Sequence, residues 1–185
     1  MIIYLDTNVI LSYFDIRDHF HLQNRTLLKQ VDITFVTGFI TIIEYESVIS
    51  RLWRVNQIQF DEEILEMINN LPEHVQVRSI TETCLNLLNL TILPVSGLEK
   101  IKLTNEEYLV ENSFSIAYEL GTHLSLRTLD TIQIASALKI KHYTNFNVEY
   151  FLTNDKNILN NAKDIRKTTQ IIPLSSKELS SILKL

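Results

Sequence analysis

Two short stretches decide the fold: residues 2–8, IIYLDTN, and residues 150–155, YFLTND. Each is a run of apolar, β-forming residues that ends abruptly in residues favouring turns and helix N-caps. An apolar run without alternation is typical of a strand that is buried on both faces, as in a parallel sheet. We therefore predict two central parallel strands, at 2–5 and 150–153, each followed directly by a helix.

The pattern between and beyond these strands predicts further alternation of helices and strands. The clearest helix spans residues 40–56, where Ile42, Tyr45 and Ile49 recur at intervals of three and four. The other expected elements are helices at 9–14, 22–30, 60–71, 79–90, 105–121, 126–141, 156–163 and from Ser175 or Ser176 onward, and strands at 33–37, 90–95 and 170–174. Such alternation favours an α/β class, a three-layer α/β/α domain around a central parallel sheet. Since no repeat or linker interrupts it, we predict a single domain over residues 1–185.

Composition limits the classes of protein that remain. The net charge of −5 does not suggest a strongly basic nucleic-acid binder, although an acidic metal centre would contribute to such a charge. The single cysteine, Cys84, excludes an internal disulfide, fits a reducing cytoplasm and is predicted to be a buried, inert thiol. The chain starts without the features of a signal peptide, and no apolar run reaches the roughly 20 residues of a membrane span. We therefore expect a cytoplasmic protein without a membrane partner.

Four acidic residues stand at positions where the predicted topology would gather them. Asp6 and Asp155 each follow one of the two central strands, and ligand sites in open parallel sheets form at the carboxyl ends of strands. Glu44 lies near the start of the helix that follows the next strand, in an apolar neighbourhood. Asp130 lies in a helical segment with very little other charge. The sequence therefore predicts a cluster of four carboxylates at one edge of the sheet.

Converging carboxylates indicate a particular chemistry. Their mutual repulsion is costly, and a divalent cation relieves it. Hard oxygen ligands select Mg²⁺ or Mn²⁺ over softer metals. Such a cation lowers the pKa of a bound water, orients it for in-line attack and stabilises the departing oxygen, which suits hydrolysis of a phosphodiester bond.

Each acid also has a plainer interpretation. Asp6 and Asp155 would serve equally as helix N-caps or in Asx turns. Glu44 would serve as a solvated helix residue, and Asp130 as a favourable charge near the start of a helix. Taken singly these signals are weak, and the order and context of the four together carry the metal interpretation.

Four segments resemble the PIN-domain family, and in particular the VapC-type toxins of bacterial and archaeal toxin–antitoxin systems. The matching segments are YLDTNVIL at 4–11, ITIIEYESV at 40–48, LRTLDTIQIASAL at 126–138 and FLTNDKNIL at 151–159. They occur in the family's order and span nearly the whole chain. The first and third are fairly specific, the fourth is moderately so, and the second depends mainly on Glu44.

The resemblance implies a PIN-like fold and an endoribonuclease activity with Mg²⁺ or Mn²⁺. By motif, the catalytic and metal-binding acids would be Asp6, Glu44, Asp130 and Asp155, supported through hydrogen bonds by Thr7, Asn8 and Thr153. The chain is longer than compact members, with extra helical material around 58–104. This difference bears on antitoxin pairing and substrate class more than on the chemistry.

The resulting prediction is a metal-dependent endoribonuclease that acts as the toxin of a type II toxin–antitoxin pair. The alternatives are a stand-alone RNA-processing nuclease and a catalytically silent RNA-binding or scaffold protein. A missing acid would favour the silent protein, yet all four motif positions are filled. We also expect a homodimer packed through the helical regions around 10–30 and 40–60.

Three arginines are candidates for contacts with RNA phosphates. Arg51 lies seven residues after Glu44 and so on roughly the same helix face, and Arg54 lies about one turn further on. Arg127 lies about one turn before Asp130. A solvated helix face explains each of them equally well.

Overall fold

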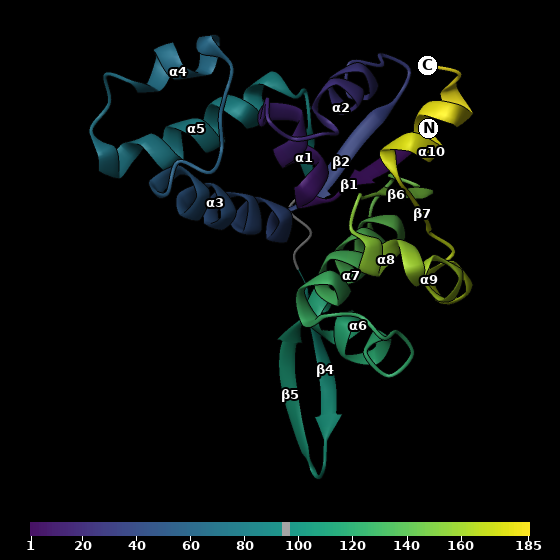
Figure 1. The fold of residues 1–185 in the computed structure, drawn as a ribbon. Coiled ribbons are helices and arrows are strands. Elements are labelled where there is room, and N and C mark those ends of the chain that lie inside the picture. The colour runs from purple at the N-terminus through teal and green to yellow at the C-terminus, as the bar shows by residue number, and fades with distance from the viewer. Residues whose placement is uncertain (94–96) are drawn as a thin grey trace.

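A central parallel sheet organises the molecule (Figure 1). The computed structural model describes residues 1–93 and 97–185, and within them five parallel strands pair in the order β3-β2-β1-β6-β7. The strands are β1 (Ile2–Leu5), β2 (Thr34–Gly38), β3 (Thr91–Leu93), β6 (Tyr150–Leu152) and β7 (Ile172–Leu174). In the central strand, Ile3 lies opposite Phe35 of β2 and Tyr150 of β6. The two stretches that decide the fold are therefore direct neighbours, and their carboxyl ends meet at one edge.

Helices cover both faces of this sheet. Successive side chains of β1 point to opposite faces, so this strand contributes to an apolar cluster on each. Ile3 and Leu5 pack into one apolar cluster, whereas Tyr4 packs into the other and stacks on Phe151 with ring centroids 5.1 Å apart. The first cluster includes residues of α1 (Thr7–Phe14), α2 (His21–Leu27), α3 (Phe39–Arg54), α4 (Glu62–Ile68), α5 (Glu73–Leu87) and α10 (Ser176–Leu183). The second includes residues of α6 (Asn112–Leu120), α7 (Thr128–Tyr143), α8 (Lys156–Asn160) and α9 (Ala162–Thr169). The predicted three-layer α/β/α architecture is confirmed.

A β-hairpin projects from the body where the sequence analysis expected helix (Figure 1). The prediction of one helix over 105–121 is wrong in its first part, because β5 (Glu106–Glu111) pairs antiparallel with β4 (Leu98–Leu103), and α6 begins only at Asn112. The tight turn places Thr104 at φ 58°. Exposed and half-buried residues alternate along β4, which is the two-residue period of a strand. The extra region around 58–104 thus contains strands as well as helices.

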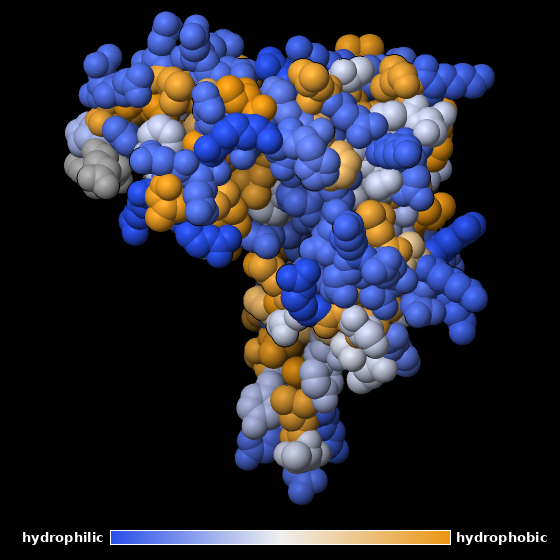
Figure 2. Space-filling model, viewed as in Figure 1, coloured by the Kyte–Doolittle hydropathy of each residue, from blue (hydrophilic) through white to orange (hydrophobic). Residues whose placement is uncertain are grey.

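The base of the hairpin is attached to α7 by polar contacts. The buried Lys139 ammonium forms an ion pair with Glu111, and burial lowers the pKa of Lys139. The Tyr143 hydroxyl donates to Glu99 at 2.8 Å. Gly97 precedes β4 at φ 157°, where an added Cβ would lie 2.7 Å from the Asn112 amide. Figure 2 shows apolar residues gathered where the hairpin joins the body.

The remaining differences concern the ends of elements. The helix predicted at 156–163 is two helices, α8 and α9, which meet at Asn161. The helix predicted at 79–90 begins earlier, at Glu73, and the helices predicted at 22–30 and 60–71 are shorter than expected. Of the strand predicted at 90–95, residues 94 and 95 lie outside the described residues. Within the described ranges, no helix has both the length and the apolar character needed to cross a membrane.

Candidate active site

Asp6 and Asp155 both lie beyond the carboxyl ends of the neighbouring strands, Asp6 directly after β1 and Asp155 three residues after the last residue of β6. The Asp6 Oδ1 accepts the backbone N–H of Thr7 at 2.7 Å and caps α1, while the Asp155 Oδ1 accepts that of Asn157 at 2.6 Å and caps α8. The plainer capping interpretation is therefore correct for both. Capping uses only one oxygen of each carboxylate, so the second oxygen of each remains for other contacts.

The second oxygen of Asp6 lies inside the protein among polar side chains. Asp6 is 5% exposed, and its Oδ2 accepts from the Thr153 hydroxyl at 2.5 Å and from the Asn8 amide. Burial, reinforced by the negative charges of Glu44 and Asp130, raises the pKa of Asp6 to about 7, although the Thr153 hydrogen bond opposes this. At neutral pH such a carboxyl group is only partly ionised, and a bound cation would favour its ionised form.

Glu44 is held beside Asp6 by hydrogen bonds from α1 and α7. Its Oε2 accepts from the Thr7 hydroxyl at 2.5 Å and from the Gln133 amide. It is half-buried, so the interpretation as a freely solvated helix residue is wrong. The orientation of Gln133 is set by Thr41, whose hydroxyl donates to the Gln133 carbonyl oxygen at 3.2 Å.

Gln133 is a site residue that the sequence analysis missed. It is buried, and its amide contacts the Thr7 hydroxyl at 3.0 Å as well as Glu44. The available signal was its position three residues after Asp130, which places both on one helix face. A long polar amide among the apolar residues of IQIASAL was the second part of that signal.

Asp130 and Asp155 are joined by a cation from the same chain. The Arg127 Nε lies 3.3 Å from the Asp130 Oδ2, and its Nη2 lies 3.0 Å from the Asp155 Oδ2. Asn157 adds a neutral contact by donating its amide to the Asp130 Oδ2 at 3.0 Å. Asp130 lies in the first turn of α7, so its plainer role near the positive end of a helix is also compatible with its position.

The predicted supporting residues connect the two halves of the site. The Thr153 hydroxyl donates to Asp6 and accepts the backbone N–H of Asp155 at 3.0 Å. Asn8 donates to Thr153 at 3.0 Å, and its carbonyl oxygen accepts the backbone N–H of Asn154 at 2.9 Å. Together with the Thr7 contact to Glu44 and the Arg127 bridge from Asp155 to Asp130, these bonds form one network at the carboxyl edge of the sheet that includes all four acids.

The network has the donor chemistry of a site for a hard cation, namely carboxylate, hydroxyl and amide oxygens. Within residues 1–93 and 97–185, however, no three Asp, Glu, His or Cys side chains are grouped closely enough to hold a metal ion. Hydrogen bonds surround Asp6 and Glu44, and a guanidinium lies against Asp130 and Asp155. The four acids therefore lie at one edge of the sheet, but their carboxylates do not converge on a single point.

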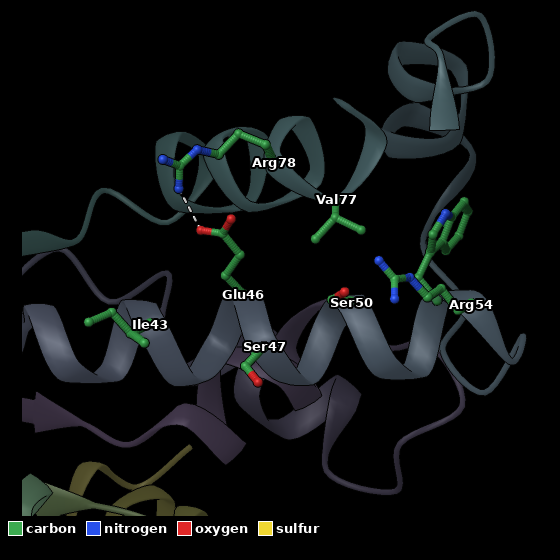
Figure 3. A pocket seen from close by; sticks show the side chains of 8 residues that line it. Ile43, Glu46, Ser47, Ser50, Arg54, Val77 and Arg78 are labelled. Atoms are coloured by element: carbon green, nitrogen blue, oxygen red, sulfur yellow. Dashed lines mark hydrogen bonds and ion pairs between the residues drawn. The ribbon is translucent and has the colours of Figure 1, made fainter. Parts of the chain in front are cut away.

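A groove of about 740 Å³ lies between α3 and α5 and begins one residue before Glu44 (Figure 3). It extends from Ile43 to Arg54, and Glu46 and Arg78 form an ion pair across it at 2.5 Å. Arg51 and Arg54 are exposed, and neither side chain has a hydrogen bond or ion pair in the part of the chain that the structure describes. Arg127, by contrast, is engaged with two site acids.

Comparison with known proteins finds similarity in structure alone. No family model matches the sequence, and no curated protein matches it. A chain of VapBC2 from Rickettsia felis, solved bound to a DNA fragment from their promoter, matches with a TM-score of 0.52 and 15% identity, covering 95% of this chain and 98% of that one. A chain of FitAB bound to an IR36 DNA fragment matches with a TM-score of 0.48 and 14% identity, covering 94% of each.

The similarity to VapBC2 extends over nearly the full length of both chains. At this level of identity it shows a shared fold. The PIN-like fold expected from the four sequence segments is therefore confirmed, while the roles of individual residues rest on the geometry described above.

Proposed function

We propose that this PIN-like domain is a Mg²⁺- or Mn²⁺-dependent endoribonuclease and the toxin of a type II toxin–antitoxin pair. The observation that carries the proposal is the network that includes Asp6, Glu44, Asp130 and Asp155 at the carboxyl edge of the sheet. Its buried member, Asp6, has a pKa raised to about 7 by burial and by its acidic neighbours. A structural N-cap has no need of other acids nearby, whereas a cation site does.

The side chains around the acids set the direction in which the carboxylate oxygens point. Thr7 and Gln133 hold Glu44, and Thr153 and Asn8 hold Asp6. Neighbours of this kind orient metal-binding carboxylates and strengthen a site. When bound, Mg²⁺ or Mn²⁺ would lower the pKa of a coordinated water and stabilise charge at the phosphate.

The outer surface of α3 supports RNA as the substrate. Glu44, Arg51 and Arg54 lie along one side of the helix at spacings of seven and three residues. An RNA strand that extends from the acids along α3 would therefore pass both arginines. Arg54 lies ten positions after Glu44, a distance of about 15 Å along the helix axis. Cations without acidic partners are available to phosphates, in agreement with a role for Arg51 and Arg54 in binding RNA.

The decisive experiment is cleavage of single-stranded RNA by the purified protein with Mg²⁺ or Mn²⁺ and again in excess EDTA. We expect cleavage that needs the metal and that Asp6→Asn abolishes. Undiminished cleavage in EDTA would contradict the metal chemistry. Equal cleavage by wild type and Asp6→Asn would assign the activity to a contaminant or to another site.

RNA binding measured without metal tests the proposed RNA surface independently of the proposed metal chemistry. Arg54→Ala and Arg51→Ala, measured by fluorescence anisotropy in EDTA, should each weaken binding and lower the slope of log K against log salt by about 1. Arg166→Ala is the matched control, because Arg166 on α9 is also exposed. An equal loss in all three variants would show a general charge effect and contradict a path along α3.

A protein partner is supported by exposed apolar side chains near the site. Phe39, Ile43 and Phe114 are each at least half exposed and line a groove of about 380 Å³. We propose that a cognate antitoxin binds this protein and suppresses its activity, which co-expression with the neighbouring reading frame tests. Failure of every adjacent product to co-purify or to inhibit would contradict this role and favour a stand-alone nuclease.

We also propose a homodimer. Leu22 and Val55, in or next to the helical regions named for the interface, are strongly exposed. Light scattering at tens of micromolar should give twice the monomer mass of 21.5 kDa. A monomer mass at that concentration would reject the dimer without bearing on catalysis.

A further inference from the structure

Arg127 contacts the site in a way that differs from every other neighbour of the four acids described above. Its guanidinium bridges two carboxylates from separate elements, Asp130 on α7 and Asp155 at the β6–α8 junction. The donors around Asp6 and Glu44 are neutral hydroxyls, amides and a backbone N–H. One half of the site is therefore held by neutral groups, and the other half by a positive charge.

On Asp155, Arg127 contacts the carboxylate oxygen that remains once the helix cap is made. The Asp155 Oδ1 caps α8, and the Arg127 guanidinium contacts Oδ2. On Asp130, Arg127 and Asn157 both contact Oδ2. A cation that used these two carboxylate oxygens would compete for the same lone pairs as the guanidinium, which presents its donors in a rigid fork.

The exposure of Arg127 makes the contact replaceable. Its side chain is 70% exposed, whereas those of Asp130 and Asp155 are 17% and 28% exposed. Withdrawal of the guanidinium would uncover no core and would leave the backbone of α7 in place. An ion pair at such an exposed position contributes little free energy, so a divalent ion can outcompete it.

We propose that Arg127 is an internal counter-cation, which neutralises Asp130 and Asp155 in the metal-free protein and which a divalent ion must displace. The inference rests on the proposed metal-dependent function and adds a competitor within the chain to it. Arg127 then sets the threshold of metal concentration at which the site loads. The displaced guanidinium remains one turn before Asp130, at the edge where a substrate phosphate would lie.

The test is the affinity for Mn²⁺, measured by isothermal titration calorimetry without RNA. We expect Arg127→Ala to bind Mn²⁺ about two- to tenfold more tightly than wild type, the range expected for loss of two exposed ion-pair contacts. Arg127→Lys, which retains the charge without the fork, should lie between them. Arg166→Ala removes the same charge from α9 and corrects for the change in net charge.

A thermal readout accompanies the titration. Without metal, Arg127→Ala should melt below wild type, because two neighbouring carboxylates lose their counter-cation, and Mn²⁺ should raise its melting temperature by more than it raises that of wild type. If Arg127→Ala binds Mn²⁺ no more tightly than Arg166→Ala, Arg127 is not a competitor and the inference is wrong, while the metal site stands. If wild type and all variants fail to bind Mn²⁺, the metal-dependent function and the inference are both wrong.

Discussion

The β1–α1 and β6–α8 junctions each place an aspartate between a strand and a helix, in two different environments. Asp6 directly follows β1, Asp155 comes three residues after the end of β6, and the Oδ1 of each caps the next helix. Asp6 is nearly sealed from solvent among neutral donors, and its pKa is raised to about 7. Asp155 is 28% exposed and meets a guanidinium. A capping role thus does not determine whether a carboxylate is buried or paired with a cation. The elements packed around the carboxylate determine that.

The difference follows from the order of the strands. β1 lies at the centre of the sheet, so Asp6 is close to side chains from α3 and α7 and to Thr153, which directly follows β6. β6 lies one strand nearer the edge formed by β7, and Arg127 reaches Asp155 across the surface. The two junctions can therefore be tested against each other, with substitutions that keep both caps.

The largest expected effect is on catalysis by the buried member. Asp6→Asn retains an N-cap acceptor and the shape of the side chain but removes a charge, and RNA cleavage should fall by a factor of about 100 or more. The metal-free melting temperature should stay level or rise, because repulsion with Glu44 and Asp130 is relieved. Mg²⁺ should stabilise wild type more than the variant.

The contrary result for Asp6 is equally specific. If Asp6 were only a cap, Asn would replace it with little change in activity, stability or the response to Mg²⁺. Full activity together with an unchanged Mg²⁺ response in Asp6→Asn would remove Asp6 from the site. The proposed function would then lose the observation that carries it.

The raised pKa of Asp6 at the β1–α1 junction should make the stability of the protein depend on pH. Asp6 ionises near its ordinary pKa of 3.8 in the unfolded chain and near 7 in the folded, metal-free protein. The folded state thus binds this proton more tightly than the unfolded chain does. The stabilisation that results is fully present below about pH 4 and is lost as the pH rises to about 7. Between these limits the free energy of unfolding should fall by up to about 1.4 kcal/mol per pH unit. Urea unfolding at several pH values should show this fall in wild type, and Asp6→Asn should lack it. Parallel curves for the two proteins would contradict the raised pKa.

Thr153 links the two junctions, so its hydroxyl should matter to both. Thr153→Val removes the donor to Asp6 and the acceptor for the Asp155 N–H and the Asn8 amide while keeping the shape. Loss of these hydrogen bonds, one of them to the buried Asp6, should lower the free energy of unfolding by about 1–3 kcal/mol. Thr153→Ser retains the hydroxyl and should lose less. A Thr153→Val variant as stable as wild type would contradict a role for the hydroxyl.

The smallest expected effect is on the stability of the β6–α8 junction. Asp155→Asn keeps the cap and loses an exposed ion pair with Arg127, so the metal-free free energy of unfolding should change by less than about 1 kcal/mol. RNA cleavage should nonetheless fall. A loss of stability above about 2 kcal/mol, seen in urea unfolding, would show that Asp155 is principally structural and that the junctions differ less than proposed.

Local patterns predicted the part of the fold that holds the acids. The strands at 2–5 and 150–153 were identifiable because they are short, wholly apolar and ended by cap residues. The hairpin at 98–111 escaped prediction because segments this short carry few periods from which to distinguish a strand from a helix. Gln133 escaped prediction for another reason. Its role depends on Thr7, Thr41 and Glu44, which are distant in sequence.

Local sequence is sufficient to locate the ends of strands and the helix caps, and hence to predict that four acids lie at one edge of a parallel sheet. These are local properties, set by side-chain shape, backbone preference and hydrophobic period. Only the tertiary structure decided which acid is buried, which neutral groups orient Glu44 and Asp6, and that Arg127 lies between Asp130 and Asp155. Burial and charge depend on groups brought together from distant parts of the chain, because desolvation and Coulomb interactions act through space.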